Sequence, residues 1–287
     1  MAVISVPLQA EPNMLSRLMR RPTAAVGIAV LMIIVLAAIL APVIAPYAPT
    51  KLSIASRLHP PSLDHLFGTD DLGRDILTRM LYAARTSLTV GFAVVIFASI
   101  IGVVLGLTSG FFRTLDAPVS RLIDAMMAFP DILLAIALVA ALGATAVNVV
   151  VALGVVYAPR LARVVRASTL VIRELPYVEA ARALGVPTPV ILVRHVLRNV
   201  TSPLLVQGTF IFANAILAEA GLSFLGVGIS PDIPTWGTMI ATGRQYMDQA
   251  GWIMMFPGAA IVVTVLSLQL VGDGLRDLLD PRLAKDI

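Results

Sequence analysis

One polar stretch stands between two long apolar segments of the chain: Tyr177-Val178-Glu179-Ala180-Ala181-Arg182-Ala183-Leu184-Gly185, running on to His195-Val196-Leu197. A polar island in such surroundings is typical of a loop at one face of a membrane. Pro176 suits the first position of a helix, and Gly185 suits the residue just past its end. Thr188 then offers a cap for a second helix that begins at Pro189. The stretch therefore predicts two short helices joined at a glycine.

The first of these helices carries a narrow apolar stripe. Its members fall at positions i, i+3, i+4 and i+7, which are Tyr177, Ala180, Ala181 and Leu184. Small residues at the centre of the stripe would let another protein approach the backbone closely. Glu179 and Arg182 lie outside the stripe, where a polar contact would fix the orientation of that protein.

The composition excludes an ordinary soluble domain. The chain has 287 residues, of which 58% are hydrophobic and 13% charged, and its mean hydropathy is +0.92. Soluble proteins are about a quarter charged. The absence of cysteine removes disulfides and thiolate metal sites. No basic face interleaved with aromatic residues points to nucleic acid, so we expect a lipid bilayer as the surroundings of the chain and no nucleic-acid partner.

Charge-poor blocks predict six membrane spans and hence an all-α, polytopic membrane protein. The block from Ala125 to Pro159 is too long for one crossing of about 20 residues, and Gly143 to Asn148 is its natural turn. The expected spans are 23–46, 86–112, the two halves of 125–159, 202–225 and 251–272. Residues 1–22 would form a lead with a short interfacial helix at 14–21, and 284–287 would form a tail.

The distribution of basic residues predicts the orientation of these spans. If both ends of the chain are cytoplasmic, 15 of the 21 basic residues lie inside and 6 lie outside. The outside residues are Lys51, Arg57, Arg74, Arg79, Arg85 and Arg244. The chain is therefore expected to be N-in and C-in, with the Glu179 segment in the cytoplasm.

Motifs for catalysis are missing from the sequence. A P-loop needs a lysine after a glycine, and neither Lys51 nor Lys285 follows one. Gly221-Leu222-Ser223 is faintly similar to an intramembrane serine protease, but no histidine lies in a span to act as its base. We expect no enzyme activity, and no catalytic, metal or cofactor site, in this chain.

A second motif lies in the expected outer loop, about residues 47–85. It reads His65-Leu66-Phe67-Gly68-Thr69-Asp70-Asp71-Leu72-Gly73-Arg74-Asp75. Two glycines around an Asp pair, with Arg and Asp close behind, predict a tight turn with local ion pairs that caps the second span. The residues that define this motif are Gly68, Thr69, Asp70, Gly73, Arg74 and Asp75.

Two acids fall inside the expected spans, Asp131 and Glu219, and charges there are costly and usually functional. Pro130 breaks the helix before Asp131 and would free carbonyls to face a cavity. Glu219, together with Asn214, would line or gate a path for a peptide's amino terminus or a metal cation. The alternative for both acids is a packing role, in which the carboxylate bonds to the backbone or to a neighbouring helix.

Three glycines on the second span, Gly102, Gly106 and Gly110, recur at i, i+4 and i+8. Such a face of small residues packs closely against another helix. The partner helix is either another span of this chain or a span of a second subunit.

Together these motifs resemble those of the ABC importer permeases that work with a binding protein, in their dipeptide/oligopeptide/nickel branch. The EAA loop of that family reads Glu-Ala-Ala, three residues, Gly, nine residues, Ile-x-Leu-Pro. The matching positions are Glu179, Ala180, Ala181, Gly185 and Leu197, with His195 at the Ile position. Arg198 replaces the final Pro. The outer-loop motif, Ala128-Phe129-Pro130, Leu217–Gly226 and Trp236-Gly237 also match that branch, so the resemblance covers about 23–283.

The resemblance implies the fold of type I ABC importer permeases over residues 23–283, with a coupling loop at about 163–200. It implies four partners besides the bilayer: a homologous second permease subunit, two ATPase subunits that bind the ATP, and an extracytoplasmic solute-binding protein. The residues that would couple to the ATPases are Glu179, Ala180, Ala181, Gly185, His195 and Leu197. The expected location is the membrane of a bacterial or archaeal cell.

The expected function is to form half of a translocation pathway for di- or oligopeptides or a related small solute. Nickel, glutathione and haem-like molecules are other substrates within the family, so the substrate is open. The alternative is an ion-coupled secondary transporter or channel that works without an ATPase. Such a protein would show inverted repeats and buried ion-binding residues, and neither is clear in this sequence.

Overall fold

A computed structural model describes residues 18, 19 and 21–279. The helix expected at 14–21 lies mostly outside the described residues, and the tail at 284–287 lies wholly outside them. The described part is almost all helix and contains no strand longer than the single bridge between Thr69 and Asp75. Its α- and π-helices are α2 (Pro22–Ile44), α3 (Ile76–Phe111), α4 (Arg113–Met127), α5 (Asp131–Leu142), α6 (Ala146–Ile172), α7 (Pro176–Ala183), α8 (Thr188–Val190), a π-helical segment (Ile191–Leu197), α9 (Arg198–Phe224), α10 (Trp236–Gly243) and α11 (Trp252–Leu279). Two short 3₁₀ helices lie at Ile54–Ser56 and Arg244–Tyr246.

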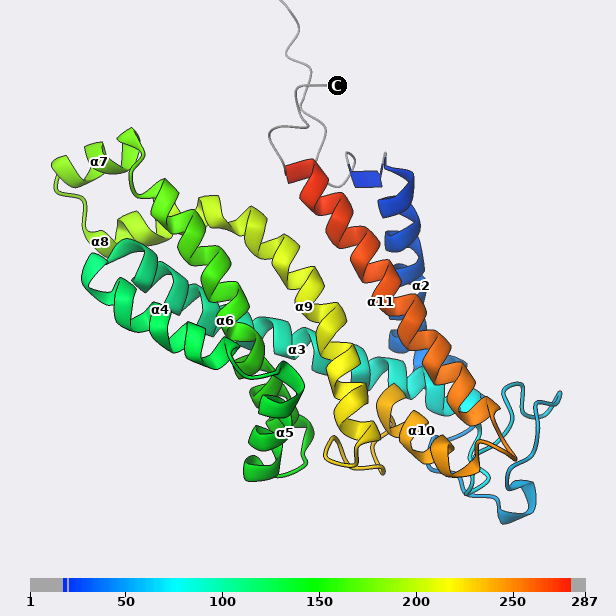
Figure 1. The fold of residues 1–287 in the computed structure, drawn as a ribbon. Coiled ribbons are helices and arrows are strands. Elements are labelled where there is room, and N and C mark those ends of the chain that lie inside the picture. The colour runs from blue at the N-terminus through cyan, green and yellow to red at the C-terminus, as the bar shows by residue number, and fades with distance from the viewer. Residues whose placement is uncertain (1–17, 20, 280–287) are drawn as a thin grey trace, which may run out of the picture.

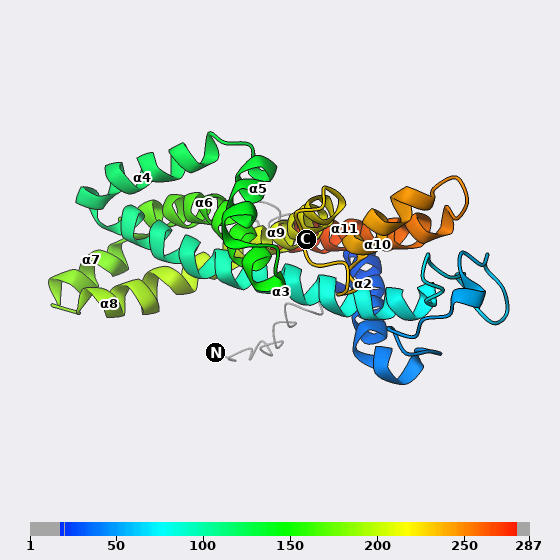
Figure 2. The ribbon, with the colours of Figure 1, turned by 90° about the horizontal axis from the view of Figure 1, so that it is seen from below.

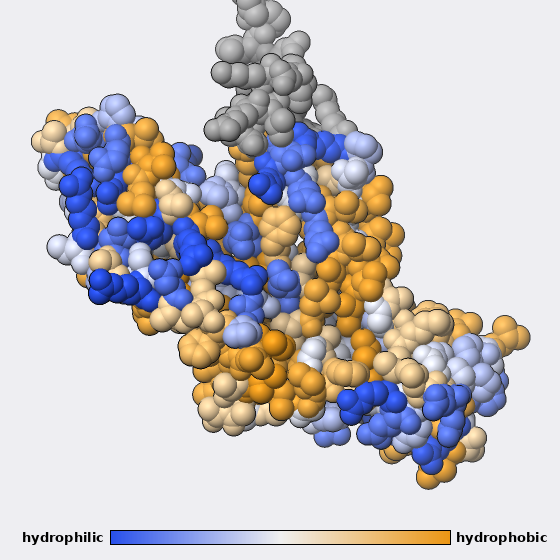
Figure 3. Space-filling model, in the orientation of Figure 1, coloured by the Kyte–Doolittle hydropathy of each residue, from blue (hydrophilic) through white to orange (hydrophobic). Residues whose placement is uncertain are grey.

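The predicted membrane-spanning architecture is confirmed. Five helices are long and apolar enough to cross a bilayer, and a sixth span is formed if the bent pair α4–α5 is counted as one. Figure 3 shows hydrophobic residues covering the outer surfaces of α2, α11 and α5. This surface suits contact with lipid.

The third span differs from the prediction. α5 has 12 residues, or about 18 Å at 1.5 Å per residue, which is too short for a hydrocarbon core of about 30 Å. α4 precedes it at an angle of 92°. The bend falls at Pro130, the N-cap of α5, because proline has no N–H to continue the helical ladder and disfavours the helical conformation at Phe129. The third span is therefore a broken helix.

Three helices run further than the apolar pattern predicted. α3 begins at Ile76, ten residues before residue 86, because Asp75 caps it. α6 continues past Pro159 to Ile172, since its arginines are paired with acids. α8, the π-helical segment and α9 join into one helix of 37 residues, Thr188–Phe224. Polar residues that the hydropathy pattern assigned to loops thus lie on helices.

The two ends of the bundle carry different parts of the chain. Figure 1 shows the start of α2, the end of α11 and α7 at one end, here named the α7 end. Residues 45–75 and α10 lie at the opposite end, here named the α10 end. This arrangement agrees with an even number of crossings. α3 runs along the length of the molecule between the two ends, as the view from below also shows (Figure 2).

The glycine face on the second span packs within the chain, against α6. Cβ atoms placed on Gly102, Gly106 and Gly110 would lie 2.5, 2.5 and 2.6 Å from the Cβ atoms of residues on α6, namely Leu161, Val165 and Thr169. No real Cβ atom tolerates such a contact, so only glycine permits this approach of the two backbones. The sequence left open whether the partner helix belongs to this chain or to a second subunit, and the structure shows that it is α6 of the same chain.

Candidate coupling loop and transport pathway

α7 is a short helix with a well-defined end. Pro176 occupies its first turn. Gly185 has φ +75° and donates its N–H to the carbonyl of Arg182 at 3.0 Å, and the Val186 N–H bonds to the carbonyl of Ala181 at 3.0 Å. These two bonds form a Schellman motif, which needs a left-handed residue that glycine adopts most easily. The predicted helix and its glycine stop are present.

The apolar stripe of α7 is mostly exposed. Leu184 is 84% exposed and Tyr177 is 43% exposed, and Ala180 lies between them on the surface. Ala181 departs from the prediction, because it is 8% exposed and packs with Val178 against the neighbouring helices. The free stripe is therefore narrower than the sequence indicated.

Polar groups flank the α7 stripe. The side chain of Glu179 is at the surface. The Arg182 guanidinium lies 4.6 Å from the centre of the Phe111 ring, at the end of α3. This cation–π contact holds Arg182 against the bundle.

The second helix of the loop differs from the prediction in its cap. Pro187 is the N-cap residue, and Thr188 is already helical with no side-chain capping bond. The next turns, Ile191–Leu197, are π-helical, a form that is often found at functional sites. Arg198 continues directly into α9, because no proline interrupts the helix where the family has one.

His195 and Tyr177 connect the two helices of the loop. Their rings lie 6.0 Å apart between centres. The Asn199 amide donates to the Tyr177 hydroxyl at 3.2 Å and to the His195 carbonyl at 2.6 Å. α7 is thereby attached to the start of α9, and a movement of α7 would be passed to that helix.

A ladder of ion pairs joins α6 to α4 and α5. Arg160 pairs with Asp131, Arg163 with Asp124 at 2.7 Å, and Arg166 with Asp116 at 2.6 Å. The three arginines recur every three residues, so they share one side of α6. Figure 3 shows hydrophilic residues gathered over α4 and α6. Sequence reasoning missed this ladder, although the arginine spacing was a visible signal for it.

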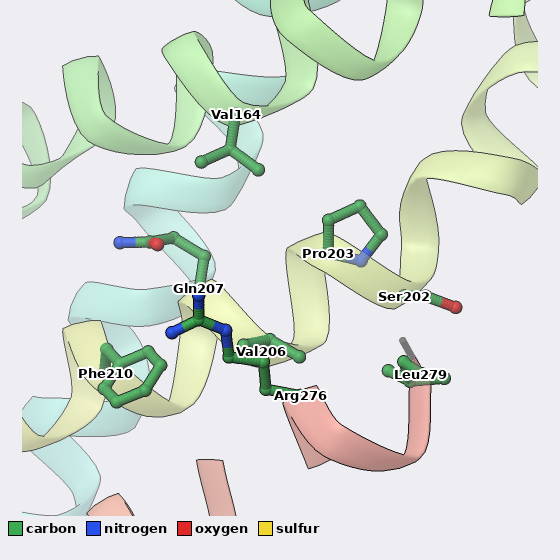
Figure 4. Close-up of a pocket in the computed structure, with 8 residues that line it drawn as sticks. All are labelled: Val164, Ser202, Pro203, Val206, Gln207, Phe210, Arg276 and Leu279. Atoms are coloured by element: carbon green, nitrogen blue, oxygen red, sulfur yellow. The ribbon is translucent and has the colours of Figure 1, made fainter. Parts of the chain in front are cut away.

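Two cavities lie beside α9. One, of about 230 Å³, is lined by Asp131, Tyr157 and Asn214 together with Ile132, Ala135, Leu153, Leu217 and Ala218, and is here named the middle cavity. The other, of about 480 Å³, lies nearer the α7 end, and is here named the α7-end cavity. It is lined by Val164, Ser202, Pro203, Val206, Gln207, Phe210, Arg276 and Leu279. Figure 4 shows the side chains of Gln207 and Arg276 extending into it, with Val164 on the opposite wall.

Two of the three predicted pathway residues meet at the middle cavity. Asp131 and Asn214 both line it, although they are far apart in the sequence. The Tyr157 hydroxyl donates to the backbone carbonyl of Asn214 at 3.3 Å, and the Asn214 amide donates to the Phe210 carbonyl. The sequence did not single out Tyr157, because an aromatic residue in a span is ordinary.

Glu219 lines neither cavity. It is 1% exposed, and its Oε1 accepts hydrogen bonds from Ser223 at 2.8 Å and from Thr235, the N-cap of α10, at 2.9 Å. The second oxygen, Oε2, has no hydrogen-bond partner among the described residues. This arrangement ties α10 to α9 and favours the packing alternative. A role of Glu219 in the pathway stays a prediction.

The outer-loop motif forms a tight, buried turn. Asp70 accepts from the N–H groups of Leu72 and Arg74 at 2.9 Å each, and from the Arg74 guanidinium at 2.6 Å. Asp75 caps α3 by accepting from the Thr78 N–H at 2.8 Å, and it also contacts His65 at 2.9 Å. The turn therefore fixes the position where α3 begins.

The glycines of the motif permit close backbone contacts. Gly68 and Gly73 have φ values of +76° and +70°. A Cβ on Gly73 would lie 1.8 Å from the Ser53 carbonyl oxygen. The Thr69 carbonyl accepts from the Trp252 indole at 3.2 Å, which joins the turn to α11.

Comparison with known proteins places the chain among transport components. Residues 98–285 match the family described as "binding-protein-dependent transport system inner membrane component". Residues 13–61 match the N-terminal transmembrane domain of oligopeptide transport permease C. The first match contains the segment from Tyr177 to Leu197, and the second covers α2 and the start of the outer loop.

Relatives that match most of the chain agree with this assignment. A putative peptide transport system permease protein of Brucella suis is 51% identical, covering 93% of this chain and 90% of the relative. A dipeptide transport system permease protein of Alkalihalophilus pseudofirmus is 42% identical over 93% and 88%, and a di/tripeptide transport system permease protein of Pseudomonas aeruginosa is 42% identical over 90% and 87%. The chain thus belongs to the family of inner-membrane components of binding-protein-dependent transport systems, as a multi-pass membrane protein.

Proposed function

We propose that the chain forms half of the translocation pathway of an ATP-driven importer for di- or oligopeptides or a related small solute. Relatives named as peptide, dipeptide and di/tripeptide permeases support the substrate class. A homologous permease subunit would supply the other half. A solute-binding protein would deliver the substrate, and two ATPase subunits would bind and hydrolyse the ATP.

One observation carries this proposal: a single helix of 37 residues, Thr188–Phe224, extends from the α7 end to both cavities. Its beginning is bonded to α7 through Asn199. Further along, Gln207 lines the α7-end cavity and Asn214 lines the middle cavity. These two residues are seven apart and so share one face of the helix. A force applied at α7 would reach the face that borders both cavities.

The mechanism follows from this connection. ATP binding would bring the two ATPase subunits together and move α7, which contacts one of them through Tyr177, Ala180 and Leu184. The movement would turn or shift α9 and change which end of the pathway is open. No covalent bond is made or broken in this chain, and its residues hold, orient and release the solute.

The proposed orientation places the α7 end in the cytoplasm. Fifteen of the 21 basic residues then lie inside, as the positive-inside rule expects. The α10 end, with residues 45–75, would face the solute-binding protein. This assignment is required by the proposed function, because ATP is available only in the cytoplasm.

Cross-linking from α7 tests the proposal. The chain has no native cysteine, so Leu184→Cys gives a single reactive site on an exposed side chain. The complex in vesicles should yield a disulfide between this site and a cysteine in the groove of the ATPase subunit, and ATP should change its yield. Leu63→Cys at the α10 end, where Leu63 is 97% exposed, is the control and should form none. An equal yield from both positions, or none from Leu184→Cys in an assembled complex, would refute the coupling role.

A further inference from the structure

We infer that Asp131 and Arg160, with Tyr157 and Asn214, form a transient binding site for the two charged ends of a short zwitterionic peptide. The peptide's ammonium group would bind to Asp131 and its terminal carboxylate to Arg160. The inference rests on the proposed function, because it concerns the solute that passes through the pathway. It names the residues that would hold that solute part of the way across.

The middle cavity supplies the walls of this site. Asp131 comes from α5, Tyr157 from α6 and Asn214 from α9, so three helices converge on a space of about 230 Å³. Ala135 and Ala218 contribute small side chains to the lining, which leaves room beside the carboxylate. The remaining lining is aliphatic. Such a mixture of apolar walls and a few placed polar groups is typical of a small-molecule site.

Arg160 stands at the border of this cavity. Its guanidinium pairs with Asp131 and lies 5.6 Å from the centre of the Tyr157 ring. The side chains of Arg160 and Asp131 are 38% and 37% exposed in the single chain, so both remain accessible. The structure therefore presents a cation and an anion side by side at an apolar cavity.

Charge balance explains why a zwitterion suits this pair. Within a membrane-spanning pathway, an ion that loses its partner is destabilised, because little water is present to replace that partner. A zwitterion brings one charge of each sign, so each side chain exchanges its partner for a new one and no charge is left alone. A solute with a single net charge would leave one member of the pair without a partner.

The dimensions favour short peptides. An extended chain spans about 3.3–3.6 Å per residue, so the two ends of a dipeptide lie roughly 7 Å apart. The long, flexible Arg160 side chain can open to that separation. The cavity is smaller than the 300 Å³ or more that is usual for drug-sized ligands. It therefore fits two or three small residues.

The ladder itself contains a matched control. Arg163 and Asp124 join α6 to α4, the other half of the broken third span, and pair at 2.7 Å, but neither residue lines the middle cavity. They are also more exposed, at 53% and 65%. A purely structural role of the ladder would apply to both pairs, whereas a binding role applies only to the pair at the cavity.

Photo-cross-linking of a labelled peptide tests the site. The assembled transporter, with its ATPase subunits and binding protein, would carry a photoreactive amino acid at Leu217, which lines the cavity. The probe is tritiated L-alanyl-L-alanine, illuminated during ATP-driven uptake. We expect a labelled adduct on this chain. The same photoreactive group at Leu266, an exposed residue of α11 that does not line the cavity, should give none.

Variants separate binding from folding. Asp131→Asn and Arg160→Gln should each lower the adduct and the uptake about tenfold, the scale for losing a charge-assisted hydrogen bond. The control variants Asp124→Asn and Arg163→Gln should keep the adduct yield and the uptake within about twofold of wild type, because exposed ion pairs contribute little. The double variant Asp131→Asn/Arg160→Gln should remain defective, although it leaves no unpaired charge. The amount of assembled complex and its ATPase rate monitor folding.

Each outcome has a defined meaning. Uptake without an adduct at Leu217, or full recovery in the double variant, would overturn the inference and leave the proposed function standing. An equal loss of adduct and uptake in the variants of both ion pairs would also overturn it, in favour of a structural role. Failure of the wild-type complex to take up the dipeptide at all would contradict the proposed substrate class itself.

Discussion

A Cβ atom on Gly106 of α3 would lie 2.5 Å from the Cβ of Val165 on α6. The same spacing recurs one turn away on either side, so α3 and α6 form a continuous seam of close backbone contact. α6 also carries the arginine ladder and Tyr157, and it leads through residues 173–175 to α7. The seam therefore sets the position of the coupling loop relative to α3.

Adding one methyl group to this seam should destabilise the fold. Gly106→Ala would force α3 and α6 apart, and overpacking of this kind costs about 1–3 kcal/mol. The measurement is the thermal unfolding midpoint of the purified chain in detergent, which should fall by several degrees. Gly258→Ala is the control, because a Cβ there meets nothing within 4 Å. An unchanged midpoint for Gly106→Ala would show that the seam is looser than described.

The cap at Asp75 gives a second prediction. Asp75→Ala removes the acceptor for the Thr78 N–H and should cost about 1–2 kcal/mol. Hydrogen exchange of residues 76–79 should become faster, since these residues form the first turn of α3. Asp75→Asn keeps a good capping oxygen and should exchange almost like wild type. Hydrogen exchange of residues 76–79 in the alanine variant that is as slow as in wild type would contradict a capping role.

The glycine that ends α7 gives a third prediction. Gly185→Val would place a β-branched residue at φ +75°, where left-handed backbone costs about 1–2 kcal/mol. Because a Cβ there meets nothing within 4 Å, the cost comes from the backbone alone. We expect less solute transported per ATP hydrolysed, with normal complex assembly. Gly185→Asn, which tolerates this conformation better, should retain most of the coupling.

Glu219 is expected to act through packing. Glu219→Gln keeps an oxygen that accepts from Ser223 and Thr235, so the variant should assemble and transport at close to the wild-type rate. Glu219→Leu leaves both hydroxyls without their acceptor, at about 1–3 kcal/mol for each unsatisfied group, and should lower the amount of folded protein. A glutamine variant that assembles normally but no longer transports would instead support the pathway role.

Much of the architecture can be predicted from the sequence, because apolar length and the conformational limits of proline and glycine act locally. The helix from Pro176, its stop at Gly185 and the turn at Gly143 follow from the conformational limits of proline and glycine. The all-helical, membrane-spanning class follows from apolar length. These features need no knowledge of what each segment packs against.

Features that depend on tertiary contacts are harder to predict from the sequence. The burial of Ala181 depends on which side of α7 meets the bundle, and a stripe of small residues does not reveal this. The extension of α6 beyond Pro159 depends on acids elsewhere in the chain, such as Asp124, that balance its arginines. Likewise, Asp131 and Asn214 meet at one cavity only because the third span is broken. Hydropathy does not predict the 92° bend in that span.

We propose that this chain moves solute only with energy from a separate ATPase. The most direct measurement is uptake of tritiated L-alanyl-L-alanine into vesicles that hold the chain and its permease partner, with and without the ATPase subunits. We expect uptake only when the ATPase subunits, ATP and the binding protein are all present. Uptake by vesicles without the ATPase subunits, driven by an ion gradient alone, would contradict it.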